Sequence, residues 1–140
     1  MRGQAAFEYL VMFSIILTIL ALLTYYAQEM TDRNRSEIIS SNAVIAVNKI
    51  AEAADIVYIQ GEPSQITLFV YIPENLQAIV FYKNMIILKV RSGYGTSDVI
   101  AFSKANFTDD SFISSDSGTR KIMVSAVSIN GEGRVNVTER

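Results

Sequence analysis

Cysteine and histidine are both absent from this chain, and their absence excludes much of enzyme chemistry. Without cysteine there are no disulfides and no thiolate metal sites. Without histidine there is no Ser-His-Asp or Cys-His arrangement and no histidine-ligated metal. Paired carboxylates could still act as they do in glycosidases, but no pattern brings two of them together in a pocket. The sequence therefore predicts no enzyme, no cofactor and no metal.

The chain also has no large excess of positive or negative charge. Twelve basic and fourteen acidic residues leave a net charge of -2, and the two signs balance from Gly61 onward. A nucleic-acid partner would require a basic surface, so we expect no nucleic-acid binding.

Glycine and proline are missing from Gln4 to Gln60, and Gly61-Glu62-Pro63 then supplies a helix stop. This pattern predicts a single helix from about Gln4 to Ile59, on the order of 80 Å long at 1.5 Å per residue. Few globular helices are that long, so the helix must pass through several environments.

The first half of this helix is apolar on all sides. The run from Tyr9 to Ala27 has no charged residue, amide, glycine or proline, and Tyr25 and Tyr26 lie near its end, as at a membrane interface. It is long enough to cross a bilayer core of about 30 Å. Glu8 lies at its edge, where a carboxylate is costly in lipid and by default has a partner and a function.

After a polar stretch at residues 28–37, the second half becomes amphipathic. Its apolar residues recur every three or four positions, and Glu52 and Asp55 fall outside the stripe. The stripe consists of Ile39, Ala43, Ala46, Ile50, Ala53 and Val57. We expect this stripe to pack on the chain's own C-terminal domain, with its alanines allowing close approach.

The segment Arg2-Gly3-Gln4-Ala5-Ala6-Phe7-Glu8-Tyr9-Leu10 resembles the class III signal peptide of archaeal type IV pilins. The resemblance implies cleavage by a prepilin peptidase between Gly3 and Gln4. Glu8 is then the fifth residue of the mature chain, where pilins characteristically carry a glutamate. A secretory signal peptide would instead have a short apolar run followed by a cleavage site of small residues.

The resemblance further implies a structural subunit of a type IV pilus-like filament for adhesion or surface attachment. Its partners would be copies of itself in a helical filament, the prepilin peptidase, the pilus assembly platform and membrane lipid before assembly. The precursor would lie in the cell membrane, with its N-terminus cytoplasmic and its C-terminal domain outside, and the assembled filament would be extracellular. We expect Glu8 to set the register between subunits. The expected helix-core residues are Leu10, Phe13, Leu17 and Leu20.

Other roles remain open at this point. The apolar run could be an uncut signal anchor carrying a solitary extracellular binding domain, with Glu8 merely near the headgroups. The chain could also be a minor pilin or pseudopilin of a secretion or motility machine.

From Ser64 onward the pattern changes to short strands, which we expect to be about six in number and all antiparallel. The predicted strands are 66–72, 78–82, 86–91, 99–102, 121–129 and 134–138. Lys83-Asn84 and Asn130-Gly131 are read as hairpin turns, and Ser92 to Ser97 as a loop. Several strands are apolar on both faces, as expected if one face meets the helix and the other a second sheet or a neighbouring subunit.

The predicted fold is therefore α+β, with the second half of the long helix packed on a small antiparallel sheet or sandwich, as in pilins. The expected divisions are a leader at 1–3, a membrane and filament-core segment at 4–27, an amphipathic helix at 28–60, and an extracellular β domain at 61–140.

Three N-glycosylation sequons begin at Asn34, Asn106 and Asn136, all after the apolar run. They agree with an outside location, and Asn106, in an expected polar loop, is the best candidate for modification. The acidic segment from Asp109 to Gly118 does not have the spacing of known calcium loops, so we read it as an ordinary solvated loop.

Overall fold

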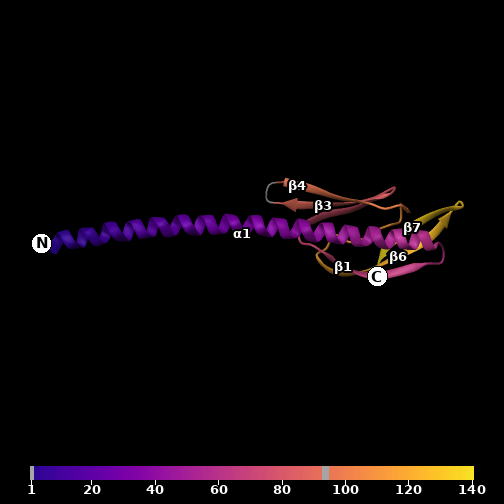
Figure 1. The fold of residues 1–140 in the computed structure, drawn as a ribbon, viewed down its shortest axis with the longest axis horizontal. Coiled ribbons are helices and arrows are strands. Elements are labelled where there is room, and N and C mark those ends of the chain that lie inside the picture. Colours follow the sequence, from indigo (N-terminus) through magenta and orange to yellow (C-terminus); the bar gives the residue numbers. More distant parts are fainter. Residues whose placement is uncertain (1, 93–94) are drawn as a thin grey trace. The chain divides into compact units, whose positions relative to one another are not determined.

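The computed structural model describes residues 2–92 and 95–140 (Figure 1). The order of elements is α1 (Arg2–Gln60), β1 (Gln65–Ile72), β2 (Leu76–Tyr82), β3 (Met85–Ser92), β4 (Gly95–Phe102), β5 (Asn106–Phe107), β6 (Gly118–Ile129) and β7 (Glu132–Glu139). The chain divides into two compact units, Met1–Arg35 and Ser36–Arg140. The predicted long helix followed by strands is confirmed, and α1 begins at Arg2, ahead of the expected start at Gln4.

The strands form two sheets. One has four strands in the order β1-β6-β7-β5, and the other has three in the order β2-β3-β4. All neighbours are antiparallel except β5, which pairs with β7 in parallel through Asn106 and Phe107. The described residues form seven strands, close to the expected six, with the short strand β5 missed. The expectation that all pairings are antiparallel was wrong, because β5 pairs with β7 in parallel.

The missed elements have local causes. β5 is only two residues long, too short to show an alternating pattern, and its position depends on the distant strand β7. β4 begins at Gly95, inside the segment that we read as a loop because of its glycine and serine content. Gly93 and Tyr94 of that predicted loop lie outside the described residues.

The core of the second unit joins the helix to both sheets. The predicted helical stripe is confirmed: Ala43, Ala46, Ile50, Ala53 and Val57 are buried, and Ile39 packs against them. The core also includes buried strand residues of the four-stranded sheet and of the three-stranded sheet. Figure 1 shows strands of both sheets beside this part of α1. The helix is therefore an integral part of the hydrophobic core, because the strands bury their apolar faces against it.

The β6–β7 hairpin turns at Asn130-Gly131, as predicted. Asn130 has a φ of 54° and Gly131 a φ of 84°. Two successive residues of positive φ match the tight turn that suits the twist of antiparallel strands, and Asn-Gly favours it because both residues tolerate that conformation.

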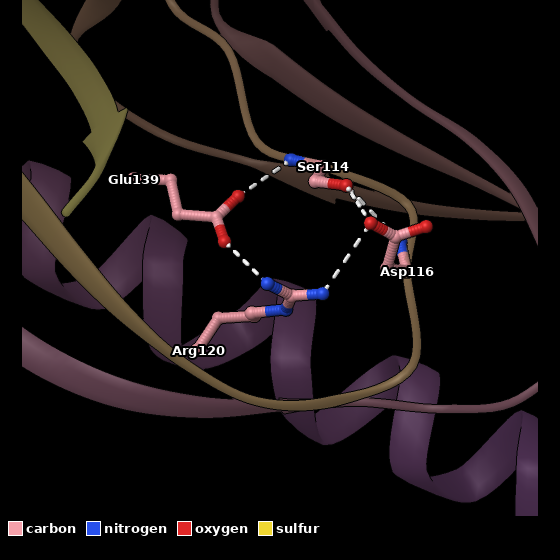
Figure 2. Close-up of polar contacts among 4 residues, drawn as sticks. All are labelled: Ser114, Asp116, Arg120 and Glu139. Carbon is pink, nitrogen blue, oxygen red and sulfur yellow. Dashed lines mark hydrogen bonds and ion pairs between the residues drawn. The ribbon is translucent and has the colours of Figure 1, made fainter.

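A polar cluster fastens the loop before β6 to the C-terminal strand (Figure 2). The Arg120 guanidinium lies 2.9 Å from Glu139 Oε1 and 3.4 Å from Asp116 Oδ2. Glu139 also accepts a hydrogen bond of 3.0 Å from the backbone N–H of Ser114. Arg120 therefore holds one carboxylate of the acidic segment, Asp116, together with Glu139 of β7, and this gives the loop a fixed attachment.

Candidate processing and assembly segment

The N-terminal part of α1 contains the predicted cleavage and assembly residues. Gly3 and Gln4 lie in its first turn, and Glu8 follows one turn after Gln4 on the same helix. Gln4 and Glu8 are both exposed. Among the side chains that the structure describes, none forms a hydrogen bond or ion pair with Glu8. Its carboxylate is therefore available to a group outside this single chain.

The apolar side chains of the segment are exposed along its whole length. Exposure runs from 40% at Val11 to 75% at Tyr9. The predicted helix-core residues Leu10, Phe13, Leu17 and Leu20 are 64%, 63%, 47% and 54% exposed. Their neighbours are equally exposed, so no single face stands out and the choice of these four residues stays a prediction.

By length and composition, one stretch of the helix is apolar enough and long enough to cross a membrane, and none of that stretch is buried. A soluble helix that is apolar on all sides would normally lie inside a protein core. This one requires lipid or other protein surfaces around it.

Hydroxyl groups inside the apolar run are satisfied by the helix itself. Ser14 donates to the carbonyl oxygen of Leu10 at 2.8 Å, and Thr18 donates to that of Ser14 at 2.8 Å. Thr24 donates to the carbonyl oxygen of Leu20 at 3.0 Å. An unpaired hydroxyl costs free energy in an apolar medium. Because these hydroxyls are paired locally, the run behaves as an apolar cylinder despite its serine and threonine residues.

The family model for the class III signal peptide matches residues 2–26. Over these residues the chain is similar to a class III signal peptide. This signal is the hallmark of type IV pilin-like proteins, and it implies processing by a prepilin peptidase and pilus assembly. Together with the long apolar helix, it fits a type IV pilin-like protein with a membrane-anchored precursor and a surface-exposed pilus. No curated protein and no solved structure matches the chain.

The sequons occupy three different settings. Asn34 is exposed on α1, Asn106 is exposed on β5, and Asn136 is half-buried on β7. Thr108, the hydroxyl residue of the second sequon, donates a hydrogen bond of 3.2 Å to Asn136 Oδ1. Asn106 thus lies on a short strand where we expected a loop, and which sequons are modified stays a prediction.

A metal site is not indicated by the described residues. Across 2–92 and 95–140, no three acidic side chains lie close enough together to hold a metal ion. The expectation of no metal and no cofactor stays a prediction.

Proposed function

We propose that this chain is a structural subunit of a type IV pilus-like surface filament that serves adhesion or surface attachment. The peptidase cuts between Gly3 and Gln4, and the subunit assembles through its apolar N-terminal helix into a filament of identical copies. The observation that carries the proposal is the class III signal peptide at residues 2–26, placed on a helix whose apolar run is exposed on all sides.

The mechanism follows from the change of environment around the helix. In the precursor, lipid surrounds residues Tyr9 to Ala27, and the Ser36–Arg140 unit lies outside the cell. On assembly the helices leave lipid and pack against each other, forming the filament core. Lipid tails are as apolar as leucine, so transfer alone provides no driving force and close packing must supply it.

Glu8 supplies the register in this mechanism. Cleavage creates a charged α-amino group on Gln4 in an apolar environment, and Glu8 of a neighbouring subunit neutralises it. Burying one charge alone is expensive, whereas burying a matched pair is tolerated. The exposure of Glu8 supports this role, because its carboxylate has no competing partner among the described side chains.

The role proposed is structural and has no catalytic step. The chain has no histidine and no cysteine, so a nucleophile activated by histidine and a thiolate nucleophile are both excluded.

The test is mass spectrometry of the N-terminal peptide, taken from a sheared extracellular fraction and from membranes. A peptide beginning at Gln4 in the sheared fraction is expected. A peptide beginning at Met1 or Arg2, found only in membranes, would instead identify an uncut anchor and remove the role given to Glu8. A cut peptide present in sheared filaments at trace level would identify a minor pilin or pseudopilin.

A further inference from the structure

The three-stranded sheet exposes an apolar surface on the face that points away from the core. Cross-strand register places Tyr82, Met85 and Phe102 in one row, and Val80, Ile87 and Ile100 in the next. We call these six residues the outer sheet patch. Phe102 is 67% exposed, Tyr82 54% and Ile100 48%. Contiguous apolar surfaces of this kind mark interaction sites on soluble domains.

The second half of α1 exposes another apolar surface. Ile38, Ile45, Ile56 and Ile59 lie along one side of the helix, and we call them the isoleucine stripe. Their exposure ranges from 47% at Ile56 to 71% at Ile59. Ile45 follows the buried Ala43 by two residues, and Ile56 follows the buried Ala54 by two. Two residues correspond to about 200° of rotation around the helix axis. The stripe therefore faces away from the core.

These two surfaces cannot meet within one copy. Ile86 and Leu88 of β3 are fully buried in the same core as Ile50 of the helix, and Ile87 points to the opposite side of the sheet because strand side chains alternate. The patch and the stripe lie on the far sides of the two elements whose near sides form the core. Any contact between them needs a second copy of the chain.

The two surfaces match in spacing and in charge. On the helix, the exposed pair Lys49 and Glu52 lies about 10 Å before Ile56 and Ile59, at 1.5 Å per residue. On the sheet, Lys89 and Asp98 form the next outward row, about 10 Å beyond the centre of the patch, at roughly 3.3 Å per residue. Lys49 and Glu52 lie between Ile45 and Ile56. The match therefore concerns the Ile56 and Ile59 end of the stripe, which, like the patch, has one basic and one acidic side chain about 10 Å away.

The patch is too small to hold a stable dimer together by itself. Taking about 200 Å² for a fully exposed large side chain, the patch presents roughly 500 Å². A specific stable interface needs about 800 Å² from each partner. A contact of this size is weak alone, but it contributes when each subunit is already held in a filament, where the effective concentration of its neighbour is high.

We propose that the outer sheet patch of one subunit packs on the isoleucine stripe of another, with Lys89 facing Glu52 and Asp98 facing Lys49 across the contact. This inference rests on the proposed filament function. The contact joins two different surfaces on opposite sides of one unit. Such a head-to-tail contact continues from copy to copy and builds an open helical array rather than a closed pair.

The first experiment uses the absence of native cysteine. The full chain with Ile56→Cys and Ile100→Cys is assembled, sheared and oxidised. We expect a ladder of cross-linked multimers, because each copy bonds to two neighbours. The matched control pairs Ile56→Cys with Phe69→Cys, which is 66% exposed on β1 of the other sheet, and should give no ladder. Each single variant should also remain monomeric on a denaturing gel.

The second experiment exchanges charges. Glu52→Lys places like charges opposite Lys89, and we expect the yield of sheared filaments to fall by about tenfold, since like-charge juxtaposition at an interface is costly. Adding Lys89→Glu should restore most of the yield. If the cysteine variants do not assemble, this rescue alone tests whether the patch contacts the stripe.

The outcomes separate the two proposals. Filaments without a ladder, a dimer from Ile56→Cys alone, or failure of Lys89→Glu to rescue would each overturn the contact proposed here and leave the filament function standing. Wild-type chain that remains in membranes and yields no sheared filament overturns the function, and this contact falls with it.

Discussion

The carboxylate of Asp55 on α1 accepts two hydrogen bonds from the segment that follows β4: one of 2.6 Å from the Ser103 hydroxyl and one of 2.7 Å from the backbone N–H of Lys104. The Ser103 oxygen in turn accepts a bond of 3.1 Å from the N–H of Ala105. Ser103 is 5% exposed. One acidic side chain at the edge of the helical stripe thus holds the chain as it leaves the three-stranded sheet for β5.

Replacing Asp55 by alanine should lower the free energy of unfolding of the Ser36–Arg140 unit by about 2 kcal/mol, because a buried hydroxyl and a backbone N–H lose their acceptor. The measurement is thermal unfolding of the detergent-solubilised full chain. Asn48→Ala, an exposed change on the same helix, is the control and should stay within about 0.5 kcal/mol. Equal effects of the two variants would contradict the role given to Asp55.

The two glycines of the β6–β7 hairpin should respond differently to alanine. Gly131 has a φ of 84°, so Gly131→Ala is strained and should cost about 1 kcal/mol. At Gly133 an added Cβ would lie 3.4 Å from the Tyr58 ring, which is close but ordinary contact. Chemical denaturation of both variants tests this difference, and a Gly133→Ala variant as unstable as Gly131→Ala would refute it.

Arg120→Ala should destabilise the C-terminal strand by about 1 kcal/mol. The guanidinium bridges Glu139 and Asp116, but it is 30% exposed and Asp116 is 77% exposed, so solvent screens part of the attraction. The loss should shrink at high salt. Lys121→Ala, an exposed neighbour, serves as the control. Hydrogen exchange should show faster opening near Ser114 in the Arg120 variant alone.

We expect a glycan on Asn106 and none on Asn136. Asn106 is exposed, whereas the Asn136 side chain accepts the hydrogen bond from Thr108 and lies half-buried. Glycopeptide mass spectrometry of the wild-type chain and of Asn106→Gln gives the answer. A glycan mass that persists on the peptide containing residue 136 in the variant would reverse the assignment.

Glu8→Ala should reduce sheared filaments by about tenfold or more while leaving precursor in the membrane, because the α-amino group of Gln4 would then be buried without a counter-charge. Glu8→Gln, which keeps the size of the side chain, should fail equally. Glu37→Ala, an exposed carboxylate on the same helix, should assemble normally. Normal filament yield from Glu8→Ala would exclude the proposed pairing.

The absence of glycine and proline was enough to predict the helix, and periodicity was enough to predict its buried stripe. Alternating three- and four-residue spacing is a property of the helix itself, so Ala43, Ile50 and Val57 could be assigned to the core without knowledge of their partners. The hairpin at Asn130-Gly131 was equally local, since both residues specify the turn.

Contacts between distant segments were not predictable in this way. The short strand β5 forms beside β7, and the bond from Ser103 to Asp55 joins residues far apart in the sequence. The sequence analysis placed Asp55 outside the apolar stripe, and Asp55 indeed makes polar contacts. Periodicity could not show that the sheet brings the Ser103 hydroxyl to the edge of the stripe. The processing residues depended instead on a motif, because Gln4 and Glu8 are exposed like the residues that follow them and have no distinguishing environment.

The hydroxyls of Ser14, Thr18 and Thr24 bond to their own helix and leave the outside of the apolar run uniform. These hydroxyl bonds are internal to the helix, so none of them has to break when the surroundings of the helix change from lipid to protein. Lipid tails and neighbouring apolar helices are then nearly equivalent surroundings for this helix. Entry into the proposed filament would therefore break none of these three hydroxyl bonds.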